Sequence, residues 1–115
     1  MSLSKDAILK ADDLPRELVQ VPEWGGTVWV RTMTGAERDA FEASVAASAD
    51  TPNLTNIRAR LAVLCVVDDK GKRLFADADA EALGGKSAAA LSRVFEAGQK
   101  LNGLTDSDVS DLEKN

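Results

Sequence analysis

Alternating apolar residues near the start of the chain predict a β-hairpin over about 17–32. The run Leu18-Val19-Gln20-Val21 stops at Pro22, which cannot donate a hydrogen bond to a strand ladder. After Gly25-Gly26, whose glycines suit the φ > 0 conformations of a turn, comes the β-branched run Thr27-Val28-Trp29-Val30. The first strand should therefore end at Pro22 or lie at an edge, and an edge strand invites pairing with another chain.

From residue 35 onward the apolar spacing changes to a helical period and predicts a small bundle of about four helices. Thr34 and Glu37 have capping-box spacing at the first helix start, and Ser87 has the chemistry of an N-cap at the third. The expected helices are about 35–48, 55–67, 87–102 and 105–113, with a short helical turn around 80–83. The second carries the widest apolar surface, so we expect it to be the most buried.

Turn-forming residues and short segments complete this pattern. Asp68 to Arg73 is rich in turn formers and allows a second small hairpin near 66–75. Ser4 can cap a short helical turn within 1–14, a segment that we expect to be poorly ordered, and 104–115 reads as an acidic C-terminal helix or tail. The pattern therefore predicts an α+β, mostly α-helical fold in a single domain, 1–115, with the hairpin packed on the bundle.

Composition narrows the classes of protein. The 115 residues suffice for one domain that folds without disulfides, and Cys65 is the only cysteine. No signal peptide and no apolar stretch approaching the ~20 residues of a membrane span is visible, so we expect a cytoplasmic protein. The net charge of −5 opposes binding to nucleic acid, although Lys70, Lys72 and Arg73 form one tight basic cluster. That cluster is better explained as a solvated turn.

Candidate catalytic and metal sites are weak. Gly85-Lys86-Ser87 imitates the end of a P-loop, but Ala80 stands where the first glycine is required, and a helix C-cap followed by an N-cap explains the same residues. With Gly71 in the sixth position of an EF-hand loop, Val66 and Lys70 would occupy ligand positions. Histidine is absent, and Cys65 lies on an apolar helix face without a base nearby. We therefore expect no enzyme activity, no cofactor and no metal.

The two tryptophans offer better candidates for a binding surface. By strand alternation, Trp29 shares a face with Arg31, while Val28 and Val30 point to the other face. If the valines pack inward, Trp29 and Arg31 form a mixed face that suits a protein partner. In the alternative, Trp29 is core and Val28 is half-exposed. Trp24, at the turn, is expected to fold back as a local cover.

The order of several short motifs resembles the phage tail assembly chaperone family. The resemblance starts with a Val-Pro-Glu-Trp-Gly-Gly strand pair that leads into a Thr-Gly-Ala-Glu-Arg helix. It covers most of the chain through Val21–Gly26, Thr34–Arg38, Val67–Phe75 and Leu101–Thr105. No binding motif of the family transfers residue by residue, so the candidate protein-binding residues, Trp29, Arg31, Trp24, Val109 and Leu112, rest on chemistry alone.

The resemblance implies a non-catalytic function in phage or prophage tail assembly. A member would bind and solubilise the tape measure protein in the host cytoplasm and promote tail tube assembly, without remaining in the mature virion. Its partners would be the tape measure protein and the major tail protein, with a homo-oligomer as a further option, and neither nucleic acid nor membrane. The alternatives are a head–tail completion or minor tail protein retained in the virion, and a self-associating adaptor.

Overall fold

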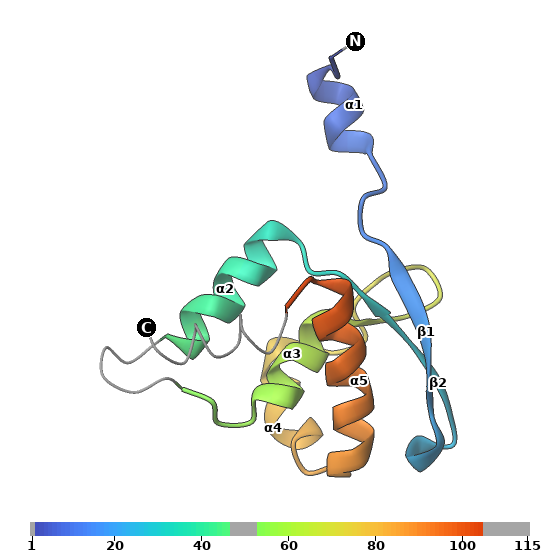
Figure 1. Ribbon diagram of the computed structural model, residues 1–115, viewed down its shortest axis with the longest axis vertical. Helices are drawn as coiled ribbons and strands as arrows, with labels where there is room; N and C mark the ends of the chain where they lie inside the picture. The colour runs from blue at the N-terminus through green and yellow to red at the C-terminus, as the bar shows by residue number, and fades with distance from the viewer. Residues whose placement is uncertain (1, 47–52, 105–115) are drawn as a thin grey trace.

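A three-stranded antiparallel sheet lies along one side of the molecule, with helices packed on one of its faces (Figure 1). The computed structural model describes residues 2–46 and 53–104. The strands are β1 (Arg16–Val21), β2 (Gly26–Arg31) and β3 (Val66–Val67), and the helices are α1 (Lys5–Lys10), α2 (Gly35–Val45), α3 (Ile57–Cys65), α4 (Ala80–Leu83) and α5 (Ala88–Leu101). This is the predicted α+β fold.

The hairpin has the predicted strands but a longer connection than a two-residue turn. Val21 pairs with Gly26, and a 3₁₀ turn over Pro22–Trp24 plus Gly25 links them. Gly25 has φ +77°, a left-handed conformation that a side chain would strain. Gly26 instead opens β2, so only one of the two glycines meets a conformational requirement of the turn.

The second predicted helix ends two residues early, because its last valines belong to the sheet. Val66 pairs with Val30 and Val67 with Trp29, which makes β3 the third strand. Both valines are about 1% exposed, and β-branched side chains suit a pleated, buried position better than a helix end. The second hairpin near 66–75 forms in reduced size, as a single bridge between Val67 and Arg73.

Caps define the helix starts where the sequence placed them. Thr34 Oγ1 accepts a hydrogen bond from the Glu37 amide at 3.1 Å, and Glu37 Oε1 accepts one from the Thr34 amide at 2.9 Å, which completes the capping box of α2. Ser87 Oγ accepts from the Ala90 amide at 3.2 Å at the start of α5. Helix α2 ends at Val45 with Ala46 as its C-cap, before the predicted end at 48. The prediction of a helix over 105–113 lies outside the described residues.

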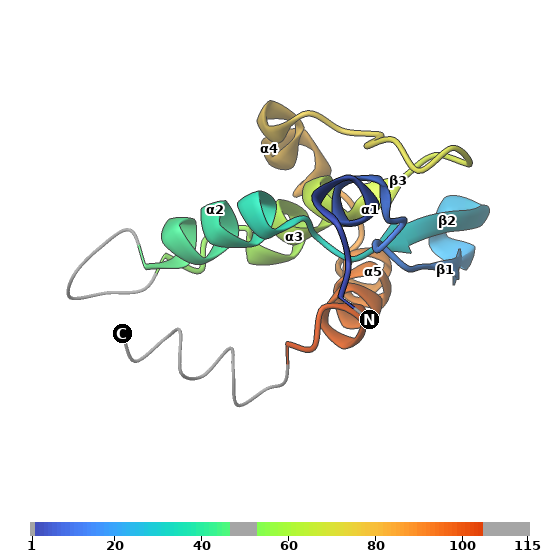
Figure 2. The ribbon, with the colours of Figure 1, turned by 90° about the horizontal axis from the view of Figure 1, so that it is seen from above.

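The core lies between the sheet and the α3/α5 pair. Helix α5 packs on β1 and β2, α3 packs on α5, and α4 lies on the opposite side of α3 from α5 (Figure 2). The largest fully buried side chains are Leu61, Val21, Val30, Val45, Val66, Val67, Val94 and Cys65. Each buried Val or Leu side chain contributes roughly 1.5–3 kcal/mol relative to an exposed one, so these contacts dominate the stability of the fold.

Helix α1 stands away from this body on the linker of residues 11–15 (Figure 1). Ser4 caps it as predicted, accepting from the Ala7 amide at 3.1 Å. None of its residues is buried, and Leu3, Ile8 and Leu9 are 74%, 55% and 73% exposed. We call residues 2–10 the arm. Its apolar side chains have no place in the core described above.

Candidate functional site

The two faces of the hairpin differ, and the difference settles the orientation of Trp29. Val30 is fully buried, and Val28 packs against the core from the same face. Trp29 therefore lies on the opposite, outer face of the sheet, where it is half-buried. The first of the two predicted orientations is the observed one. Leu18, the cross-strand partner of Trp29 on β1, is 49% exposed on that outer face.

Trp29 fastens the loop of residues 68–73 to the hairpin. Its indole Nε1 donates a hydrogen bond to Asp69 Oδ1 at 3.0 Å. The guanidinium of Arg16 lies 4.5 Å from the ring centroid and donates to the carbonyl oxygen of Asp69 at 2.9 Å. An exposed cation–π contact contributes about 0.5–1 kcal/mol. The side chain of Trp29, a candidate for partner binding, therefore makes part of its contacts within the protein itself.

The same loop is also held together internally. Asp68 Oδ1 accepts hydrogen bonds from the amides of Lys70 at 2.8 Å and Lys72 at 3.0 Å, while Gly71 takes φ +84° at the turn. The Lys72 amide, the larger influence, and the Lys70 amide hold the pKa of the Asp68 carboxyl below its usual range. These contacts fit the interpretation of Lys70, Lys72 and Arg73 as a turn, because the carboxylate of Asp68 orders the loop that carries them.

Arg31 is an internal anchor. It is 7% exposed, and its Nη1 and Nη2 donate to the two carboxylate oxygens of Glu37 at 3.0 and 3.1 Å. Its Nη1 also donates to the carbonyl oxygen of Thr32, and its Nε is buried with no hydrogen-bond partner in the described part of the chain. Arg31 is therefore not a free surface cation beside Trp29, and its contact with a partner stays an untested prediction.

Glu37 combines this ion pair with the capping box. Burial is the largest single influence on its carboxyl and favours the neutral form, but the hydrogen bonds from Arg31 and Thr34 together outweigh it and lower the pKa of Glu37. The end of β2 and the start of α2 are thus joined through one carboxylate. Arg73 Nη1 adds a longer contact of 4.0 Å to the same group.

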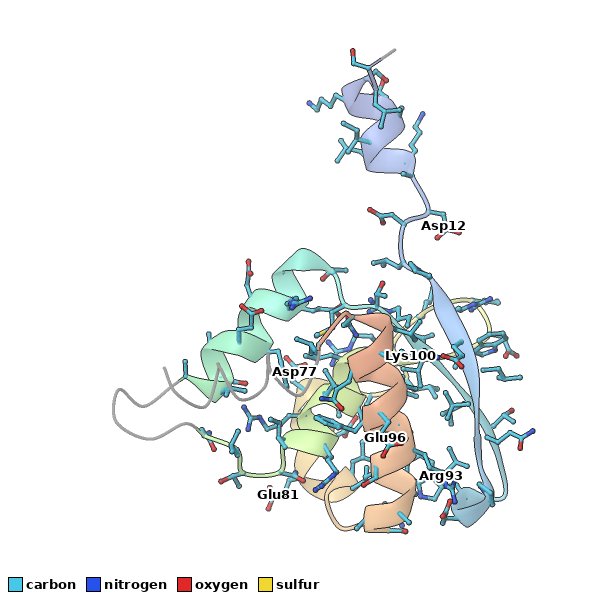
Figure 3. The ribbon with its side chains drawn as sticks, in the orientation of Figure 1. Asp12, Asp77, Glu81, Arg93, Glu96 and Lys100 are labelled. Atoms are coloured by element: carbon cyan, nitrogen blue, oxygen red, sulfur yellow. The ribbon has the colours of Figure 1, made fainter. Side chains whose placement is uncertain are left out.

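Trp24 folds back over the core as predicted, and it is half-buried there. The neighbouring Glu23 pairs with Arg93 on α5, with the Arg93 Nε and Glu23 Oε1 atoms 2.9 Å apart. Figure 3 shows Arg93 pointing to the hairpin tip. The other two candidate binding residues, Val109 and Leu112, lie outside the described residues.

The outer edge of the sheet is exposed and could bind a protein segment. Of its residues, the sequence indicated Trp29 as a binding candidate. Strand β1 is an edge strand, because the strand order is β1-β2-β3. The Thr32 amide donates to the carbonyl oxygen of Pro15, and by antiparallel alternation the amides of Leu18 and Gln20 then point away from β2. We call Leu18, Gln20, Thr27 and Trp29, together with the free edge of β1, the outer hairpin surface.

The apolar residues of the arm were not singled out as binding candidates from the sequence. Ile8 and Leu9 are the large apolar residues of the short helical turn that Ser4 caps. A run of one helical turn with two adjacent apolar residues carries no clear amphipathic signal. Their exposure becomes evident only because the arm extends away from the bundle (Figure 1).

Three further observations on the described residues concern metal ligands, the cysteine thiol and helix length. Within 2–46 and 53–104, no group of three His, Cys, Asp or Glu side chains is placed to hold a metal ion. Burial raises the pKa of the Cys65 thiol to about 12, so this thiol stays protonated at neutral pH. No described helix is long and apolar enough to cross a bilayer.

Comparisons with known proteins find a similar fold in a solved structure and a family whose model matches this chain. A family model for the phage tail assembly chaperone matches residues 4–115. The structure of the bacteriophage HK97 tail assembly chaperone superposes with a TM-score of 0.62 at 18% sequence identity, covering 89% of this chain and 91% of that one. Among curated proteins, none matches. At this identity the structural likeness concerns the fold, while the match over residues 4–115 concerns the family.

Proposed function

Because this chain belongs to the phage tail assembly chaperone family, we propose that it binds the tape measure protein, keeps it soluble in the host cytoplasm and promotes assembly of the tail tube. The proposed function is non-catalytic. The chaperone would leave before the virion is complete. The major tail protein is the second proposed partner, since it must meet the same complex when the tube forms.

The observation that carries this proposal is the outer hairpin surface. Leu18 is 49% exposed beside half-buried Trp29, at an edge strand with free amides. Edge strands bind extended segments through main-chain hydrogen bonds, and alternate side chains add specificity. The exposed apolar residues of the arm form a second apolar area, away from the body of the fold (Figure 1). The acidic balance of the chain, with a net charge of −5, favours solubility of a complex with an aggregation-prone client.

Co-expression with the tape measure protein of the same phage tests the proposal. The wild-type chain should raise the soluble fraction of the client and co-purify with it. Leu18→Lys places a charge on the free edge and should abolish this rescue, because edge lysines oppose strand addition. Leu74→Lys is the matched control, since Leu74 is 54% exposed but lies outside the outer hairpin surface, and it should keep the rescue. If Leu18→Lys and Trp29→Ala both rescue as well as wild type, the outer hairpin surface is not the binding surface.

The free edge of β1 equally suits a second copy of this chain, which would make the protein a self-associating adaptor. Light scattering of the purified protein at several concentrations, with Leu18→Lys beside wild type, separates the two functions. An adaptor loses its oligomers in the variant without any effect on client solubility. Mass spectrometry of purified virions tests the other alternative, because stoichiometric retention would identify a structural tail protein.

A further inference from the structure

A cavity of about 580 Å³ opens between the arm and the loop of residues 68–73, outside the surfaces described so far. Its wall includes Arg16 at the start of β1, Arg31 at the end of β2 and Lys70 in the loop. Asp12 and Leu14 of the linker close the side that faces the arm. Figure 3 shows Asp12 on this linker, between α1 and β1.

The charge of this cavity is opposite to that of the whole chain. Three cationic side chains and one carboxylate line it, whereas the chain carries a net charge of −5. Arg31 is balanced by Glu37. In the described part of the chain, neither Arg16 nor Lys70 forms an ion pair, since Arg16 donates only to the carbonyl oxygens of Asp68 and Asp69. With Arg31 balanced by Glu37, the positive charges of Arg16 and Lys70 exceed the one negative charge of Asp12, so the cavity wall is electropositive.

The pairing of Arg16 with Arg31 across the hairpin is a second observation that points to a ligand for this cavity. These residues are direct cross-strand partners, and like charges in that position destabilise a sheet. Arg31 is nine-tenths buried at the cavity wall, and its Nε lacks a hydrogen-bond partner among the described residues. A buried donor without a partner destabilises the fold, so this Nε favours entry of a hydrogen-bond acceptor into the cavity that Arg31 lines.

We propose that this cavity receives an acidic side chain, Asp or Glu, from a segment of the client that runs along β1. The carboxylate lies between Arg16 and Lys70, and the apolar neighbours of that client residue contact Leu14 and the arm. A single carboxylate on a protein segment fits better than a nucleic acid, because the net charge of −5 repels a polyanion. The inference rests on the proposed function, since the client is the protein that the chaperone binds.

Lys70 is the residue that tests the proposal cleanly. Arg16 and Arg31 also hold the fold together, whereas only the main-chain amide of Lys70 bonds within the described chain, to Asp68. Lys70→Glu therefore reverses the charge of the cavity with little effect on the loop. Lys72→Glu is the matched control, because Lys72 lies two residues away in the same loop, bonds Asp68 in the same way and does not line the cavity.

The experiment uses overlapping peptides from the tape measure protein of the same phage, with fluorescence anisotropy on the full-length chain. Acidic peptides should bind, and binding should weaken at high salt concentration. Lys70→Glu should weaken it by about three- to tenfold, as expected for reversal of one partly exposed charge pair, while Lys72→Glu changes it less than about twofold. Replacing the acidic residue of the best peptide by its amide should cause a similar loss in wild type and none in Lys70→Glu.

Equal binding of wild type and Lys70→Glu, or of the acidic peptide and its amide form, overturns the inference. Capture of the full-length tape measure protein by co-expression distinguishes failure of this inference from failure of the proposed function. If wild type and Lys70→Glu both capture it equally, the inference fails while the proposed function stands. If wild type captures neither the full-length protein nor any peptide, both fail.

Discussion

Asn102 accepts a hydrogen bond from the main-chain amide of Met33 through its Oδ1 at 2.7 Å, which joins the end of α5 to the segment between β2 and α2. Its Nδ2 donates to the carbonyl oxygen of Gly98 at 2.7 Å, and its own carbonyl oxygen accepts from Arg38 Nη1 at 2.8 Å. One asparagine thus connects the end of α5 to two segments that lie 69 and 64 residues away in the sequence.

Asn102→Ala should destabilise the protein by about 1–3 kcal/mol, because the amide of buried Met33 would lose its acceptor. The free energy of unfolding in urea, followed by tryptophan fluorescence, measures this effect. Gln99→Ala is the control on the same helix and should change stability by less than about 0.5 kcal/mol. Equal stability of the two variants would show that water satisfies the Met33 amide.

Glu37→Gln should lower stability at neutral pH by about 2 kcal/mol, because the buried guanidinium of Arg31 would lose its counter-charge while the cap remains. Asp39→Asn, an exposed neighbour on α2, should be nearly neutral. Chemical denaturation of the three proteins gives the comparison.

The effect of Glu37 should depend on pH. Since the folded protein has a lowered pKa at this carboxyl, the stabilisation is fully present above the unfolded value of 4.5 and is lost as the pH falls through the folded value. The stability difference between wild type and Glu37→Gln should therefore be largest at neutral pH and shrink below 4.5. A difference that stays constant into that acid range would contradict the ion pair as its cause.

Trp29→Phe keeps the aromatic ring but removes the indole donor to Asp69. We expect faster hydrogen exchange at the amides of Asp68 and Lys72, which the loop bonds protect, and a loss of about 0.5–1.5 kcal/mol in global stability. Trp24 remains as the single fluorescent reporter in this variant. Unchanged exchange in the loop would mean that Arg16 and the bonds of Asp68 hold it without the indole donor.

Gly98→Ala should destabilise the fold although alanine favours helices by about 1 kcal/mol. A Cβ at Gly98 would lie 3.2 Å from Leu61 Cδ2, and Leu61 is 1% exposed and tightly packed. We expect a net loss of about 1–2 kcal/mol. Gly35→Ala is the control, because a Cβ added at Gly35 would meet no atom within 4 Å beyond its adjacent residues and nearby helix backbone. This variant should have neutral or slightly increased stability. Thermal unfolding of both variants tests the contrast.

Local signals predicted the parts of the fold that depend on neighbouring residues. Pro22 ended β1, Thr34 and Glu37 formed the capping box, and Ser87 capped α5. The exit of Val66 and Val67 from the helix could not be predicted from periodicity, because the same valines extend an apolar helix face. Their strand conformation depends on pairing with β2, which is remote in sequence.

The candidate site was predictable to a smaller extent for the same reason. Strand alternation placed Trp29 and Arg31 on one face, but it could not assign their partners. Glu37 lies six residues beyond Arg31 across a change from strand to helix, and Asp69 lies 40 residues beyond Trp29. Long-range contacts therefore decided which of these two side chains faces solvent.

Arg16 gives the arm a mechanical connection to the rest of the protein. It is the first residue of β1, directly after the linker, and its side chain contacts both the ring of Trp29 and the carbonyl oxygens of the loop 68–73. A force applied to the arm by a bound client would thus reach the loop through one guanidinium. Since Arg16 also begins β1, any shift of the linker that moves this residue would displace the loop of residues 68–73 with it.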